Sequence, residues 1–119
     1  MADKIKAVPV VSSRDVKSQV TKTSGNGTIT AATFSRNGKL GALSISVSPT
    51  ADVAAGNNVF VGNVPSECAS ALAGSTAGYS GNSVLVFNLA GDVLTIRVTG
   101  ATFPSGWNCG ATINYLLLY

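Results

Sequence analysis

The sequence predicts an all-β protein: a small antiparallel β-sandwich or jelly-roll head with an extended N-terminal arm. Three observations predict this fold class. Short segments of alternating apolar and polar residues recur along the chain, turns rich in Gly and Asn separate them, and no segment has the period of an amphipathic helix. With 119 residues, 45% of them apolar, the chain is long enough to bury one core of its own.

The first element is the arm. Pro9 interrupts its apolar patch, and the Gly-rich stretch "KTSGNGT" (22–28) is typical of a hinge. We therefore expect an arm and hinge over residues 1–27 and a head domain over residues 28–119. The segment "KAVPVV" (6–11) is extended enough to add a strand to the sheet edge of another protein. The residues expected to anchor the arm are Lys4, Lys6, Val8, Val10, Arg14 and Lys17.

The charge pattern bears on the partners of the arm. Only 11% of the residues are charged, against roughly 25% in average soluble domains, and the net charge of +3 belongs to the first 22 residues. No aromatic residue lies between those cations, so a solvated arm, or one that docks on protein, is favoured over one that binds nucleic acid. No apolar run reaches the roughly 18 residues that span a membrane, and no normal signal peptide is visible. We expect neither nucleic acid nor a membrane as partner.

Strands are expected at regular spacing in the first half of the head. The segment 28–34 alternates weakly and leads into "RNGK" (36–39), whose Asn-Gly pair predicts a hairpin with a type I′ turn. In the segment 40–48, Leu43, Ile45 and Val47 alternate with serines, which is the period of a half-buried strand. After a loop over 48–57, a short strand over 58–64 ends at Pro65.

The second half of the head begins with a weak signal and ends with strong ones. The Ser-rich and Gly-rich segment 66–82 is interpreted mainly as a long loop, with one helical turn over 67–72. Strands over 83–90 and 93–100 form a hairpin around the turn "AGD", and in the second of them Leu94, Ile96 and Val98 share one face. A loop over 101–109 leads to a closing strand over 110–119. The total is six or seven strands.

The closing strand predicts association with other copies. Ile113, Tyr115 and Leu117 alternate with a second set on the opposite face, and both faces become apolar towards residue 119. One face can pack on the domain's own core, and the other needs a partner, for which a symmetry-related copy is the simplest choice. The second set consists of Asn114, Leu116, Leu118 and Tyr119.

The two cysteines leave two readings open. Cys68 and Cys109 can form one disulfide that closes a long loop, or they can be separate thiols buried as small apolar side chains. A zinc site is not expected, because the chain has no His and two thiolates do not complete a tetrahedral shell.

The residue inventory argues against catalysis. The chain lacks His, the commonest general base, and its five carboxylates are scattered. Glu67 and Asp92 would have to face each other across a sugar to act as a glycosidase, and nothing in their spacing favours that. We therefore expect no enzyme activity, no cofactor and no metal.

Binding residues are expected in the loops. Tyr79 and Trp107 lie in polar, Gly-rich segments, where an aromatic ring can stack on a sugar while Asn82 and Asn108 supply hydrogen bonds. The structural alternative is that these aromatic residues pack on the core. That alternative is favoured for Trp107 and balanced for Tyr79.

Three segments resemble a known group of proteins: "VPSEC" (64–68), "VLVFNLAGDVLTIRVTG" (84–100) and "FPSGWNCGATINYLLLY" (103–119). Together they are similar to the head domains of tailed-phage appendage proteins, of the receptor-binding, baseplate, tail-fibre-tip or head-fibre type. The resemblance implies a non-enzymatic homotrimer on the virion surface, extracellular after host lysis. The N-terminal arm would attach it to other virion proteins, and the head would adhere to host-surface saccharide or protein.

Two alternatives to a tail appendage stay open. The arm is short and basic, with no coiled coil or fibrous shoulder, which fits a capsid decoration protein or head fibre with a stabilising role equally well. A free bacterial lectin or adhesin module is the second alternative, and it would need an export route.

Overall fold

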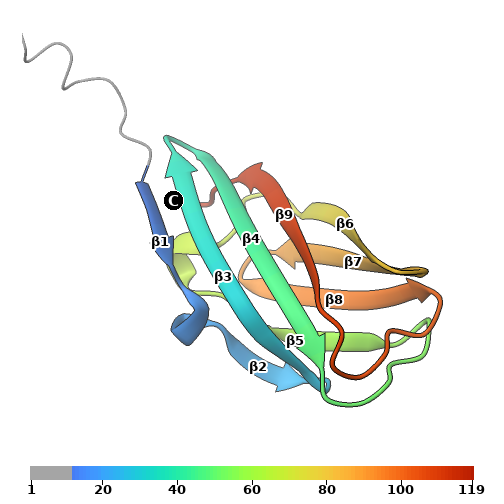
Figure 1. The fold of residues 1–119 in the computed structure, drawn as a ribbon. Coiled ribbons are helices and arrows are strands. Elements are labelled where there is room, and N and C mark those ends of the chain that lie inside the picture. Colours follow the sequence, from blue (N-terminus) through green and yellow to red (C-terminus); the bar gives the residue numbers. More distant parts are fainter. Residues whose placement is uncertain (1–11) are drawn as a thin grey trace, which may run out of the picture.

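The computed structural model describes residues 12–119, which form two antiparallel sheets packed face to face (Figure 1). The predicted all-β class is therefore confirmed, and the two sheets are consistent with the predicted β-sandwich. Sheet A has the order β1-β3-β4-β9, and sheet B has the order β2-β5-β8-β7-β6. The strands of sheet A are β1 (Ser12–Asp15), β3 (Gly27–Asn37), β4 (Leu40–Pro49) and β9 (Cys109–Leu116). Those of sheet B are β2 (Thr21–Ser24), β5 (Asn58–Asn63), β6 (Gly74–Ser80), β7 (Ser83–Ala90) and β8 (Val93–Gly100).

The core lies between the sheets and follows the alternation of the strands. Leu43, Ile45 and Val47 of β4 point inward, and their serine neighbours point outward, as the sequence predicts. Strands β7 and β8 alternate in the same way. Each fully buried side chain of this size contributes about 1.5–3 kcal/mol to folding. The largest such side chains are Phe60, Phe87, Phe103, Leu43, Ile45, Leu85, Leu89, Leu94, Ile96, Ile113 and Leu117.

Three hairpins have two-residue turns that begin with glycine. The pair Asn37↔Leu40 closes the β3–β4 hairpin, so its turn residues are Gly38 and Lys39, and Gly38 has φ +62°. Glycine at the first central position, followed by a residue with negative φ, is the type II′ arrangement. The predicted hairpin is therefore confirmed, but its turn lies one residue later than the expected Asn-Gly type I′ turn. The turns of β6–β7 and β7–β8 also begin with glycine at positive φ.

The N-terminal boundary differs from the expected one. Strand β1 pairs with β3, strand β2 pairs with β5, and the Val16 side chain between them is fully buried. Residues 12–24 therefore pair within the two sheets, whereas the sequence predicts an arm and hinge over residues 1–27. The sequence signal for strands was weak here. The segment contributes one edge strand of four residues to each sheet, and neither strand has an alternating apolar run.

Strand β6 occupies part of the segment that was expected to be mainly a loop. Its inward positions include Gly74 and Gly78 instead of large apolar residues, so the sequence carries no alternating signal. Glycine is needed there because β6 lies close to β9: a Cβ on Gly78 would meet Cys109 Sγ and the Gly110 oxygen, each at 2.9 Å. The helical turn expected over 67–72 is a short 3-10 helix, η2, over Ser66–Cys68.

The sandwich has two distinct ends, which we call the base and the tip. The base holds the β3–β4 turn, the β7–β8 turn and residues 117–119. The Leu117 N–H donates a hydrogen bond to the Lys39 oxygen of the first turn, and the Ser70 N–H donates one to the Gly91 oxygen of the second. The Leu118 N–H donates to the oxygen of Ala69, the neighbour of Ser70. Ser12 pairs with Arg36, so the described chain also starts at the base (Figure 1). The tip holds the turn Gly81-Asn82 and the loop 101–108. No helix in residues 12–119 is long and apolar enough to cross a membrane.

Candidate functional site

The loop 101–108 at the tip is held firmly by the neighbouring loop that follows β4. Phe103 is fully buried and exchanges two main-chain hydrogen bonds with Val53, at 2.8 and 3.0 Å. The Asp52 carboxylate accepts a hydrogen bond from the Ser105 N–H at 2.8 Å, and the Pro49 oxygen accepts one from the Gly106 N–H at 3.0 Å. The loop is therefore preorganised, which lowers the entropy cost of binding anything to it.

Trp107 lies on this loop and is 48% exposed. Trp107 is therefore not a buried core residue, although about half of its surface is covered at this end of the sandwich. One edge of its ring lies against Gly81 in the β6–β7 turn, where a Cβ would come within 2.7 Å of the ring. Gly81 also needs a positive φ, of +59°, so two independent constraints require glycine there. The ring is supported at this edge, and about half of the side chain is open to solvent.

The two asparagines of the predicted site lie beside Trp107. Asn108 Oδ1 accepts a hydrogen bond from the Thr30 hydroxyl at 3.0 Å, which fixes the side chain and leaves its NH2 group as a donor. The Asn108 main-chain oxygen accepts a hydrogen bond from the Ser80 hydroxyl at 3.2 Å. Asn82 follows Gly81 in the turn and is exposed. The structure thus brings Trp107, Asn108 and Asn82 together at the tip.

Tyr79 lies two residues before that turn. Its partner in the sheet is Val84, and its side chain projects from the outer face of sheet B with 74% of its surface exposed. Tyr79 is therefore not a core residue. An exposed Trp, an exposed Tyr and two amides at one end of a rigid scaffold can bind a sugar by stacking and hydrogen bonding. We call Tyr79, Asn82, Trp107 and Asn108 the tip site.

The base carries a different surface. Leu40 and Leu116 pair across β4 and β9 on the outer face of sheet A, and they are 64% and 43% exposed. Leu118 and Tyr119 follow and are also exposed, whereas Ile113, Tyr115 and Leu117 are buried, as the predicted alternation requires. We call Leu40, Leu116, Leu118 and Tyr119 the base patch.

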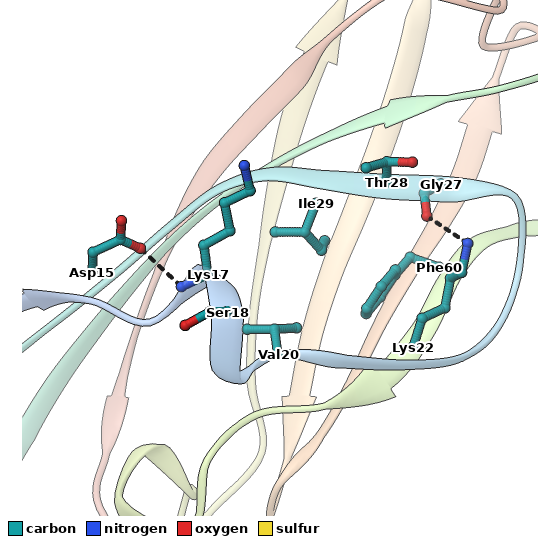
Figure 2. Close-up of a pocket in the computed structure, with 9 residues that line it drawn as sticks. All are labelled: Asp15, Lys17, Ser18, Val20, Lys22, Gly27, Thr28, Ile29 and Phe60. Carbon is teal, nitrogen blue, oxygen red and sulfur yellow. Dashed lines mark hydrogen bonds between the residues drawn. The ribbon is translucent and has the colours of Figure 1, made fainter.

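A pocket of about 480 Å³ opens on the side of the sandwich where residues 16–22 cross from sheet A to sheet B (Figure 2). Ile29 and Phe60 provide its apolar wall. Lys22 Nζ donates a hydrogen bond to the Gly27 oxygen at 3.3 Å, and the Asp15 carboxylate accepts one from the Lys17 N–H at 2.8 Å (Figure 2). Since two of its charged groups contact the main chain, we interpret this pocket as the gap left by the sheet crossing.

The residues expected to anchor the arm are only partly described. Lys4, Lys6, Val8 and Val10 lie outside the described residues. Arg14 lies in β1, where it pairs with Glu67 and donates a hydrogen bond to Gln19 Oε1 at 3.2 Å. Lys17 begins the 3-10 helix η1 (Lys17–Gln19) and is exposed. Arg14 thus contacts the head itself.

The two cysteines are free thiols, and both are buried. Cys109 begins β9 at the tip, whereas the Cys68 oxygen accepts a hydrogen bond from the Tyr115 hydroxyl at 2.6 Å near the base. Tyr115 lies six positions along β9 from Cys109, a length of about 20 Å, and a disulfide needs Cα atoms within about 7 Å. The structure therefore agrees with the second possibility, in which Cys68 and Cys109 are separate buried thiols.

The Glu67 carboxylate has an ionic partner of its own. It pairs with Arg14 of β1. Within residues 12–119 no group of three or more Cys, Asp or Glu side chains is placed to hold a metal ion.

Comparison with known proteins adds no assignment. No family model matches the chain, and no curated protein sequence matches it. The likeness to phage appendage heads therefore stays a prediction, and the geometry of the tip and the base carries the functional argument.

Proposed function

We propose that this protein is a non-enzymatic virion surface protein whose head adheres to host-surface saccharide through the tip site. The base associates with copies of itself as a homotrimer, and the residues before Ser12 attach it to other virion proteins. The virion location, the trimer and the jelly-roll class rest on the resemblance to phage appendage heads. The adhesive role rests on the structure of the tip.

The observation that carries the proposal is that the two ends of the molecule have different surfaces. The first described residue and the exposed apolar base patch lie at one end, and the exposed Trp107 and Tyr79 lie at the other. A protein that is attached by one end and adheres with the other needs this arrangement. Around a symmetry axis through the base patches, several tip sites would point the same way.

Multivalency would make shallow sites effective. A site that consists of two aromatic rings and two amides binds one sugar weakly, but linked sites gain roughly 10²- to 10⁴-fold in avidity without a new contact.

The test measures binding of the labelled full chain to a glycan array and to host cells, with the variants Trp107→Ala and Tyr79→Ala. Loss of an aromatic contact worth about 0.5–1.5 kcal/mol weakens each site by roughly 2- to 10-fold, and avidity multiplies that loss. Val93→Ala is the matched control, because Val93 is an exposed apolar residue near the base of the same sheet. It should bind like the unchanged protein.

Two results would count against the proposal. Equal binding by the two aromatic variants and the control would exclude the tip as the adhesive site. Binding of the protein to purified particles without binding to any glycan or host cell would favour the capsid decoration protein instead.

A further inference from the structure

The outer face of sheet B carries a hollow that is separate from the tip site. It has a volume of about 390 Å³ and is lined by Asn58, Val86, Asn88, Thr95, Arg97 and Thr99. This volume falls at the lower end of the range for small-molecule sites. The lining residues come from the three adjacent strands β5, β8 and β7, in the middle of the sheet.

Strand pairing fixes this set of residues. Arg97 of the central strand β8 pairs with Val86 on one side and Asn58 on the other. Thr95 and Thr99 lie two residues before and after Arg97, so they share its face. Asn88 pairs with Thr95. Because every lining side chain stands on a strand, the hollow has a rigid floor.

Arg97 is the only charged residue that lines the hollow, and it is exposed. Among the described residues, the other two arginines have partners: Arg14 pairs with Glu67, and Arg36 donates to the oxygens of Gly38 and Tyr119. No carboxylate within residues 12–119 forms an ion pair with Arg97. Its neighbours in the hollow are two amides, two hydroxyls and one valine, all neutral.

A guanidinium group has a flat fork of five N–H donors that matches the two oxygens of a carboxylate. Amides and a threonine hydroxyl both donate and accept, as the ring hydroxyls of a sugar require. The Thr99 hydroxyl already donates to the Val84 oxygen at 2.9 Å, so it faces a ligand as an acceptor. Val86 offers an apolar surface to the ring.

We propose that this hollow binds a saccharide unit that carries a carboxylate. Arg97 takes the carboxylate in two parallel hydrogen bonds, Asn58, Asn88 and Thr95 exchange hydrogen bonds with ring hydroxyls, and Val86 packs against the ring. Tyr79, Val84 and Thr99 pair with one another across β6, β7 and β8. This row of paired residues lies next to the row that contains Val86 and Arg97. Strand spacings place Tyr79 about 12 Å from Arg97, within reach of one oligosaccharide. The inference rests on the proposed adhesive function and adds the acidic class of its ligand.

The test uses isothermal titration of the full chain with an oligosaccharide that contains uronic acid, and with the same oligosaccharide after its carboxylates are reduced to alcohols. The unchanged protein should bind the acidic form about tenfold tighter or more, because a charge-assisted pair is lost on reduction. Arg97→Gln should abolish this difference and leave affinity for the reduced form unchanged. Arg97→Lys keeps the charge but loses the forked pair of N–H donors. Its preference for the acidic form should lie between that of the unchanged protein and that of Arg97→Gln.

The matched control is Lys39→Gln, which removes an exposed cation from the base turn. It should retain the full preference for the acidic form. Equal losses in Arg97→Gln and Lys39→Gln would overturn the inference, since they would mean attraction by net charge alone. A sulfated oligosaccharide that competes as well as the uronic acid would also overturn the carboxylate assignment.

The inference and the proposed function can fail separately. Binding to both forms with equal affinity, lost in Trp107→Ala, would retain the tip site and reject the acidic site. No binding to either form, together with no adhesion to host cells, would reject both.

Discussion

At the scale of single residues, glycine decides how closely the two sheets approach. Gly78 in β6 lies against Cys109 and Gly110 of β9, and it does so with an ordinary negative φ. Glycine is therefore required there by space alone. This also explains why the sequence did not predict strand β6. Positions that must be small are filled by glycine, and glycine gives no apolar alternation.

We expect Gly78→Ala to destabilise the protein by about 1–3 kcal/mol, because the added methyl group meets a sulfur atom and a main-chain oxygen at 2.9 Å. Urea unfolding at equilibrium measures this. Ala77→Ser, on the exposed face of the same strand, should change the free energy of unfolding by no more than about 0.5 kcal/mol. Equal effects from the two substitutions would mean that β6 does not pack on β9 as described.

The buried thiols give the protein a pH dependence in the alkaline range. Burial raises the pKa of Cys68 from 9.0 to about 11, while the nearby Arg14 acts in the opposite direction. Burial also raises the pKa of Cys109 and of Tyr115. Between pH 9.0 and about 11 the unfolded chain releases the Cys68 proton that the folded chain keeps. The stability present below pH 9.0 is therefore lost as the pH rises towards 11.

Urea unfolding at a series of pH values across this range should show the decline, and the decline should be smaller in Cys68→Ala than in the unchanged protein. Identical pH profiles for the two would rule out Cys68 as a contributor. A reducing agent should leave the free energy of unfolding unchanged, because neither thiol forms a disulfide.

At the scale of the elements, strand β9 and the residues after it divide into a buried set and an exposed set. Leu117 is 2% exposed, and its N–H donates to the Lys39 oxygen at 2.8 Å. Its neighbour Leu116 is 43% exposed. The alternation predicted from the sequence is correct here because β9 pairs with β4 over eight residues without a bulge, so the period of two is kept throughout.

This register gives a matched pair of substitutions. Leu117→Ala should cost about 2–5 kcal/mol, because it leaves a cavity in the core, whereas Leu116→Ala should cost about 0.5 kcal/mol or less in the isolated chain. Chemical denaturation at low protein concentration measures both, so that any assembly does not contribute. The reverse order of the two effects would place β9 in a register shifted by one residue.

At the scale of the whole molecule, the base patch is a surface that association would cover. Leu40, Leu116, Leu118 and Tyr119 are all exposed in the single chain, although their alternating neighbours in β9 are buried. Because exposed apolar side chains gain free energy when they leave water, copies of the chain are the simplest partner for them.

Light scattering should give a mass of about three chains of 12.0 kDa for the unchanged protein. The double variant Leu116→Glu, Leu118→Glu should give the mass of one chain with the same circular dichroism, since two buried carboxylates would disfavour the interface. Tyr79→Glu places a carboxylate at the opposite end and should leave the assembly intact. A mass of one chain for the unchanged protein at every concentration would refute the trimer.

The sequence by itself determined the all-β class, the β3–β4 and β7–β8 hairpins and the inward-facing residues of several strands. Period-two alternation in β4, β8 and β9 is a local property of the chain, because each strand buries one face. The exposed aromatic residues and asparagines were likewise recognised as candidates from their polar, Gly-rich surroundings.

Only the tertiary structure decided which of these residues meet. The tip site joins a turn at residues 81–82 to a loop at residues 101–108, and the Arg97 hollow is formed by three strands whose pairing no local pattern reveals. Likewise, only the tertiary structure shows that residues 12–24 pair with the two sheets, with Val16 buried between two short edge strands. The physical reason is the same in each case: local sequence fixes which way a side chain faces, but its neighbours come from long-range strand pairing and close packing of the sheets.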